Sequence, residues 1–255
     1  MPPPLKAFPS REPQIPFTIN EIRQIARRTI RLIDEVGYGC YLFGSAACHS
    51  YCYTNQTPRI PKDLDFVVFD PQNTVDAEAL KKEIERRDER FYRVKAKDPK
   101  ATHHPFWFSF SSPPDLTRSI KIDLVPSGVK GSILKIPDIP AGELVTLQAR
   151  SMRDIRLMPL VALLIMKLKG WRDHRLAPKR RLWRKMFQDV EDIHNLIIES
   201  VRRNETITSA ESYLPARFIK RGKADAKYFL RKNPEVREDR VMMRRWVKVG
   251  LVKPN

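Results

Sequence analysis

Two aspartates separated by one residue lie in a segment that reads as a β-strand. Polar and apolar side chains alternate over residues 63–66 of the apolar segment 63–69, so Asp63 and Asp65 share one face of the expected strand. Two carboxylates this close repel each other unless a cation lies between them, and Mg²⁺ prefers hard oxygen ligands. An isolated pair of this kind more often lies on a solvated sheet edge, so its meaning depends on what surrounds it.

A third carboxylate and a glycine turn occur in compatible places. Asp123 lies in the apolar segment 119–125, which also reads as a strand. If this strand lies beside strand 63–69, the three aspartates form a site for two metal ions. Gly44 and Ser45 join an apolar strand at 38–43 to a helix expected over 46–53. A glycine turn at a helix N-terminus lets backbone N–H groups approach a phosphate.

In this order the residues resemble the DNA polymerase β-like nucleotidyltransferase superfamily. Its signature is an apolar residue, Gly, Gly or Ser, a spacer, and then Asp-apolar-Asp/Glu-apolar. The Phe-Gly-Ser run at 43–45 and the Asp-Leu-Asp-Phe run at 63–66 match it, and Asp123 matches the third carboxylate. The 17 residues between Ser45 and Asp63 form a longer spacer than is typical of the superfamily. The loop expected over 54–62 accounts for the excess.

A later stretch is similar to a motif of minimal standalone nucleotidyltransferases, with the abortive-infection toxins as the nearest group. The stretch consists of Lys-Leu-Lys-Gly-Trp at 167–171 and Asp-Val-Glu-Asp-Ile at 189–193. This resemblance implies that Lys167 contacts the nucleotide phosphates and that Asp189 supports it. It also implies that Lys169 or Arg172 offsets charge on the leaving group. The resemblance covers roughly residues 20–200, and the alternative for Lys167 is a surface lysine at the end of an apolar helix.

The resemblance implies transfer of a nucleoside monophosphate from an NTP to an acceptor hydroxyl, with release of pyrophosphate. Asp63 and Asp65 would hold the Mg²⁺ or Mn²⁺ ion of the triphosphate, and Asp123 would help to hold a second ion. Gly44 and Ser45 would hold the β and γ phosphates.

Hydrophobic spacing predicts the elements that position these residues. Apolar residues recur at i, i+3 and i+4 from Ile22 to Ile33, which predicts a helix from Thr18 or Asn20 to about Gly37. A second helix is expected over 76–87. Strands are expected over 38–43, 63–69, 106–112 and 119–125, the last two as a hairpin about Pro113-Pro114.

From about residue 154 the pattern becomes helical. We expect helices over 154–170 and 181–203, followed by short basic helices after 205. The fold class is therefore α+β, with a mixed β-sheet flanked by helices and then a helical region. We predict a disordered, proline-rich leader (1–17), a catalytic domain (18–150) and a helical, basic domain (151–255).

The charge distribution indicates a polyanionic partner. The chain has 255 residues and a formal net charge of +18, and residues 167–255 hold 24 basic and 11 acidic side chains. A basic helical region of this kind favours an RNA acceptor such as tRNA. A helical surface with a basic bias explains the charge equally well.

Composition excludes other classes of protein and site. Three cysteines are too few for a disulfide framework, and the longest apolar run is too short to span a membrane. We therefore expect an intracellular protein, cytoplasmic or nuclear, with no membrane partner. His49 between Cys48 and Cys52 lacks a second ligand pair for zinc. Trp107 and Trp171 could stack on bases, but core packing is the better interpretation for both.

Two alternatives to RNA nucleotidyl transfer stay open. The chain could be a nucleic-acid-binding protein on an inactive nucleotidyltransferase scaffold, although such a protein has no use for three crowded carboxylates. An active enzyme could instead transfer the nucleotide to a protein or a small molecule. The sequence identifies neither the acceptor nor the base of the NTP.

Overall fold

The computed structural model divides into two compact units. It describes residues 5–6, 16–52, 60–70, 72, 74–98, 100–110, 118–128, 136–146, 155–178 and 180–253. Most of the predicted leader and of the loop 54–62, the Pro113-Pro114 turn and residues 151–154 lie outside these ranges. The first unit contains the described residues of 1–46, 57–138 and 146–157. The second contains those of 47–56, 139–145 and 158–255.

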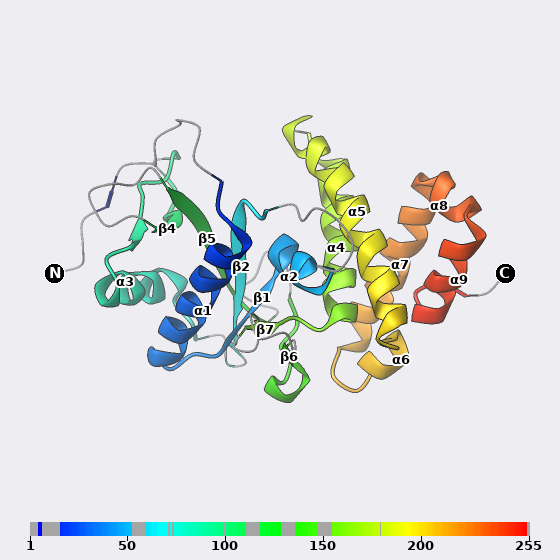
Figure 1. Cartoon of the computed structure of the whole chain (residues 1–255), viewed down its shortest axis with the longest axis horizontal. Coiled ribbons are helices and arrows are strands. Elements are labelled where there is room, and N and C mark those ends of the chain that lie inside the picture. Colours follow the sequence, from blue (N-terminus) through cyan, green and yellow to red (C-terminus); the bar gives the residue numbers. More distant parts are fainter. Residues whose placement is uncertain are drawn as a thin grey trace. The chain divides into compact units, whose positions relative to one another are not determined.

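The described strands form a seven-stranded mixed sheet in the order β3-β4-β5-β2-β1-β7-β6 (Figure 1). Their bounds are β1 Cys40–Phe43, β2 Asp63–Val68, β3 Phe91–Arg93, β4 Phe106–Ser109, β5 Ser119–Pro126, β6 Val145–Thr146 and β7 Arg156–Leu157. At its centre β2 pairs antiparallel with β1 and parallel with β5, and β4 pairs antiparallel with β5. The predicted α+β class with a mixed sheet is confirmed.

Two helices of the first unit, α1 (Ile19–Glu35) and α3 (Ala77–Arg87), contact each other and the sheet. Thr18 caps α1 in a capping box with Glu21, and every residue of the predicted apolar stripe of this helix is buried. The predicted leader ends at Phe17, which is itself buried and lies edge-on to Phe110. Lys6 forms a β-bridge with Val94.

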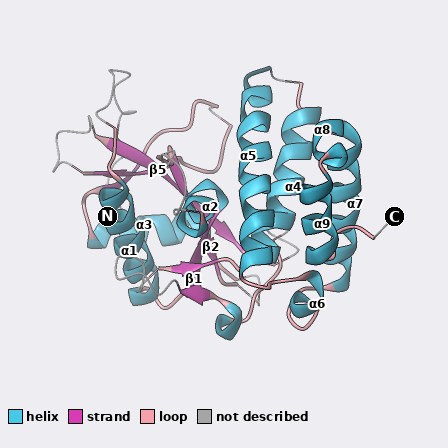
Figure 2. Ribbon diagram, turned by 45° about the vertical axis from the view of Figure 1, so that its right-hand side comes forward, coloured by secondary structure: helices cyan, strands magenta, loops and turns pink. Residues whose placement is uncertain are grey.

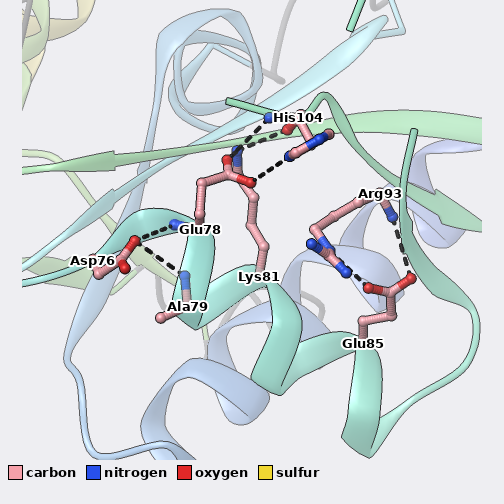
Figure 3. A network of polar contacts seen from close by, with 7 residues as sticks. All are labelled: Asp76, Glu78, Ala79, Lys81, Glu85, Arg93 and His104. Carbon is pink, nitrogen blue, oxygen red and sulfur yellow. Dashed lines mark hydrogen bonds and ion pairs between the residues drawn. The ribbon is translucent and has the colours of Figure 1, made fainter. Parts of the chain in front are cut away.

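Paired charges hold α3 against the sheet (Figure 3). Lys81 Nζ donates to Glu78 Oε1 at 2.6 Å and to the carbonyl oxygen of His104 at 2.8 Å. Arg93 Nε donates to Glu85 Oε2 at 2.8 Å, and both of these side chains are buried. Burial raises the pKa of Glu78, but hydrogen bonds from Lys81 and His104 outweigh this effect and lower it. These charges are compensated locally, so they serve the packing of α3.

The second unit is helical (Figure 2). Its helices are α4 Leu160–Leu176, α5 Arg180–Arg202, α6 Ile207–Ala210, α7 Ala216–Lys232, α8 Pro234–Glu238 and α9 Arg240–Val249, with a 3₁₀ turn at Ala141–Glu143. Helix α4 packs against both α5 and α7, and its first nine residues are all buried. A helix that is apolar on all sides is expected at the centre of a bundle. In the described residues, no helix is both long and apolar enough to cross a membrane.

The predicted helix over 154–170 begins too early. Residues 156–157 form strand β7, parallel to β1, and the helix starts at Leu160 with Pro159 as its N-cap. Proline disfavours helical backbone in the residue before it, so Met158 cannot continue a helix into Pro159. The helix predicted over 181–203 is confirmed as α5, and the one predicted over 46–53 is α2 (Gly44–Tyr51).

One prediction concerns the contact between α4 and α7. A Cβ atom on Gly222 of α7 would lie 2.6 Å from Cγ1 of the buried Ile165. The Gly222→Ala variant should therefore lower the free energy of unfolding of the second unit by about 1–3 kcal/mol. Urea denaturation followed by circular dichroism measures this change.

Gly170 of α4 is the matched control, because a Cβ atom there meets nothing within 4 Å. The Gly170→Ala variant should raise stability by about 0.5–1 kcal/mol through helix propensity alone. Equal midpoints for the two variants would show that the Gly222 contact with Ile165 does not constrain the packing.

Candidate nucleotidyltransferase site

The three predicted carboxylates lie on one face of two adjacent strands. Asp65 of β2 and Asp123 of β5 are register partners in the parallel pair, and Asp63 precedes Asp65 by two residues. Side chains of register partners point to the same face, so the alternation places all three together. Leu64 of β2 and its register partner Ile122 of β5 are both buried, on the opposite face of the sheet. The condition that the two strands be neighbours is therefore met.

The glycine turn lies directly against the second aspartate. Helix α2 begins at Gly44, immediately after β1. Gly44 has φ = +68°, and a Cβ atom there would lie 2.2 Å from Asp65 Oδ2. Only glycine satisfies both the left-handed backbone and this close approach. The turn and the carboxylate thus form one unit of local structure, with Ser45 in the first turn of the helix.

Lys121 also lies on the carboxylate face. It is the register partner of Asp63, and its Nζ lies 2.5 Å from Asp123 Oδ2. Both side chains are more than a third exposed, so this pair contributes little to stability. Its consequence is electrostatic, because one ammonium offsets part of the charge of three carboxylates. Sequence reasoning missed Lys121, although its position two residues before Asp123 already places it on the same face.

Trp107 of β4 continues the same row of side chains. It is the register partner of Lys121 in the antiparallel pair of β4 and β5, and it is half-buried. Trp107 and Asp63 therefore flank Lys121 on this face of the sheet. The other tryptophan considered from the sequence, Trp171, is fully buried in the second unit against Phe229, as core packing requires.

The oxygen donors of this face suit a hard cation, but they are not gathered around a single point. Within the described ranges, no three or more His, Cys, Asp and Glu side chains are grouped so that they could hold a metal ion. Asp123 is engaged by Lys121, whereas Asp63 and Asp65 project from alternate positions of one strand. The donor chemistry of these carboxylates fits Mg²⁺ or Mn²⁺, and a cation at Asp123 would compete with its ion pair to Lys121.

Lys167, the predicted phosphate lysine, is buried in the second unit. Its Nζ lies 2.6 Å from Asp192 Oδ2 and 3.6 Å from Asp189 Oδ1. Only 8% of Lys167 is exposed, so it is not the surface lysine that was the alternative. Burial lowers the pKa of Lys167, but the negative charges around it outweigh this effect and raise it.

Asp189, predicted to support Lys167, is one of its two acidic partners. Asp192 is the nearer of the two, at 2.6 Å from Lys167 Nζ against 3.6 Å for Asp189. Asp189 is 5% exposed, and its Oδ2 lies 2.6 Å from His174 Nδ1. His174 is held by a hydrogen bond to Asp189. Helices α4 and α5 thus share a chain of ionisable groups.

The other two predicted basic residues each have an acidic partner in the second unit. Lys169 Nζ lies 2.5 Å from Asp173 Oδ2, one helical turn further along α4. Arg172 is ion-paired with the buried Asp225 of α7. Burial raises the pKa of Asp225, and Arg172 acts in the opposite direction. A phosphate role for either residue stays a prediction.

Comparison with known proteins identifies the fold. No family model and no curated protein matches the chain. A solved antigenic nucleotidyltransferase-like protein from Paracoccidioides brasiliensis matches over 88% of this chain and 93% of its own, with a TM-score of 0.58 and 13% sequence identity. The chain has a nucleotidyltransferase fold. The predicted resemblance to the superfamily is thereby confirmed for the fold, and the likeness to the abortive-infection toxins stays a prediction.

Two structures of the antibiotic-resistance factor ANT(2″)-Ia match this nucleotidyltransferase fold less well. A crystal structure in complex with adenylyl-2″-tobramycin covers 82% of this chain and 98% of its own, with a TM-score of 0.40 and 10% identity. A solution structure covers 73% and 93%, with a TM-score of 0.37 and 11% identity.

Proposed function

We propose that the protein is a metal-dependent nucleotidyltransferase that transfers a nucleoside monophosphate from an NTP to a hydroxyl of RNA. One observation supports this above all others: Asp65 and Asp123 are partners on adjacent parallel strands, on the face that carries Asp63. The contact of Gly44 with Asp65 adds a phosphate-binding turn beside the carboxylates.

In this proposal the acceptor hydroxyl loses its proton to water, and its oxygen attacks the α-phosphorus and forms the new P–O bond. The bond from the α-phosphorus to the bridging oxygen breaks, and pyrophosphate leaves with that oxygen. Asp63 and Asp65, joined by Asp123, would hold Mg²⁺ or Mn²⁺. When bound, the metal supplies positive charge to the triphosphate and acidifies the acceptor hydroxyl.

The chain's own groups act on the rest of the substrate. Backbone N–H groups at Gly44 and Ser45, with the Ser45 hydroxyl, would donate to the β and γ phosphates. Lys121 lies on the carboxylate face, where its ammonium would pair with an anionic oxygen of the triphosphate. Lys167 as a phosphate contact remains part of the proposal.

The test is incubation of the full chain with each α-labelled NTP, Mg²⁺ or Mn²⁺, and total cellular RNA. Label on RNA that depends on both metal and protein is the expected result. Label on the protein itself or on a small molecule would show that this molecule, and not RNA, is the acceptor.

One observation favours a second candidate, a nucleic-acid-binding protein without catalysis. Asp123 is engaged by Lys121, and in the part of the chain that is described no metal-holding group is assembled. Absence of label from every NTP, together with tight RNA binding, would support this candidate against the enzyme.

A further inference from the structure

Two aromatic side chains near the start of α5 are exposed. Trp183 is 47% exposed and Phe187 is 70% exposed, and Leu176 at the end of α4 is 66% exposed. Within the described residues, no other aromatic side chain is among the large exposed hydrophobic ones. Exposed apolar side chains that are grouped on one surface and rimmed by polar residues are a feature of interaction sites.

Trp183 and Phe187 lie on one face of α5, and a hydrogen bond fixes the orientation of the Trp183 ring. Trp183 and Phe187 are four residues apart on one helix, so they share a face, with a rise of about 6 Å between them. The indole Nε1 of Trp183 donates to the carbonyl oxygen of Ala177 at 3.0 Å. This hydrogen bond satisfies the polar edge of the indole, so the exposed remainder of the ring is available to a partner.

Basic residues dominate this segment, and the exposed Glu191 one turn after Phe187 marks the end of the basic stretch. Between His174 and Gln188 the sequence contains six Lys and Arg residues and no Asp or Glu. Arg180, Arg184 and Lys185 of α5 are exposed. Arg180 lies one turn before Trp183, and Arg184 lies one turn before Phe187 on the same side of the helix. Basic groups thus alternate with the aromatic rings along this surface.

We propose that this surface, formed by Arg180, Trp183, Arg184 and Phe187, binds unpaired nucleotides of an RNA strand. The two rings stack on neighbouring bases, and the guanidinium groups pair with the phosphates between them. The identity of the polyanion as the RNA acceptor rests on the proposed function. Trp, Phe and Arg are also enriched at protein interfaces, and it is the excess of basic side chains in this segment that favours a polyanion.

The experiment measures binding of a fluorescein-labelled, single-stranded 12-nucleotide RNA to the full chain by fluorescence anisotropy, without NTP or metal. The Trp183→Ala/Phe187→Ala variant should bind more weakly by about 30-fold or more, because each of the two stacked bases is worth about 1–3 kcal/mol and 1.36 kcal/mol is a factor of ten. Trp183→Phe alone should keep affinity within about threefold, since a phenyl ring still stacks. For a duplex RNA of the same length, the double variant and the natural chain should have nearly equal affinities, because paired bases are not available for stacking on the two rings.

The matched control is Val241→Ala, which truncates another exposed apolar side chain of the second unit, on α9. It should leave affinity for the 12-nucleotide RNA unchanged. Equal affinity of the double variant and the natural chain would overturn the proposal. Concentration-dependent self-association in ultracentrifugation that the double variant abolishes, with RNA affinity intact, would overturn it in favour of a protein interface.

Failure of this inference is separable from failure of the proposed function. Weaker RNA binding by the double variant, without label transfer by the natural chain, would support the surface and not the enzyme. Label transfer to RNA with unchanged RNA affinity in the double variant would support the enzyme and not the surface.

Discussion

The Asp65→Asn variant should lose nucleotide transfer by about a thousandfold or more, with a Tm equal to or above that of the natural chain. Removal of a metal-holding carboxylate removes several kcal/mol of charge stabilisation from the transition state, and each 1.36 kcal/mol is a factor of ten in rate. Asparagine keeps the shape of the side chain beside Gly44. Stability is retained because the substitution relieves repulsion with the register partner Asp123.

Label transfer from the α-labelled NTP and thermal melts of the same sample test both parts of this prediction. Asp63→Ala should behave in the same way. Glu83→Gln on α3 is the control, since this half-buried carboxylate pairs with Arg86 and Arg87 of its own helix. Transfer by Asp65→Asn at the natural rate would remove the carboxylate face from the mechanism, and a marked fall in its Tm would assign Asp65 a structural role.

The Lys167→Met variant should destabilise the second unit by about 3–5 kcal/mol. The substitution leaves Asp189 and Asp192 close together and mostly buried without their shared cation. A buried charge that loses its partner costs this much, whereas loss of an exposed pair costs less than about 1 kcal/mol. Urea denaturation of the full chain, followed by tryptophan fluorescence, gives the free energy of unfolding.

A double-mutant cycle identifies the cause of this loss. Lys167→Met/Asp192→Asn should recover part of the stability lost in Lys167→Met, because the second substitution removes one of the stranded charges. Lys220→Met on the exposed side of α7 is the control and should change stability by less than about 0.5 kcal/mol. A loss below about 1 kcal/mol in Lys167→Met would show that water or relaxation compensates the two carboxylates.

Local patterns predicted the elements that carry the candidate site. The apolar stripe of α1, the alternation in β2 and the hairpin of β4 and β5 each depend on neighbours in sequence, and each was predicted correctly. Strand β3 was missed because three residues are too few for a periodic signal. Strand β7 was predicted as part of a helix, because its parallel pairing with β1 joins segments that are far apart in the chain.

The site itself was predictable only in part. The residue types and spacing identified the aspartates, but the neighbourhood of β2 and β5 depends on topology that no spacing expresses. The spacing of apolar residues on α5 does not give their exposure either, since Ile198 is 39% exposed and Ile197 is fully buried. Trp183 and Phe187 were passed over because apolar residues at helical spacing read as core until the packing of the helix is known.

The contact between Gly44 and Asp65 constrains how this chain can change over evolutionary time. Any side chain at position 44 meets the carboxylate at position 65, so a substitution of the glycine is accepted only after the aspartate has been replaced by something smaller. The reverse order carries no such barrier. A descendant that had abandoned transfer would therefore lose Asp65 first, and Gly44 would persist beside the vacated position as a record of the lost carboxylate.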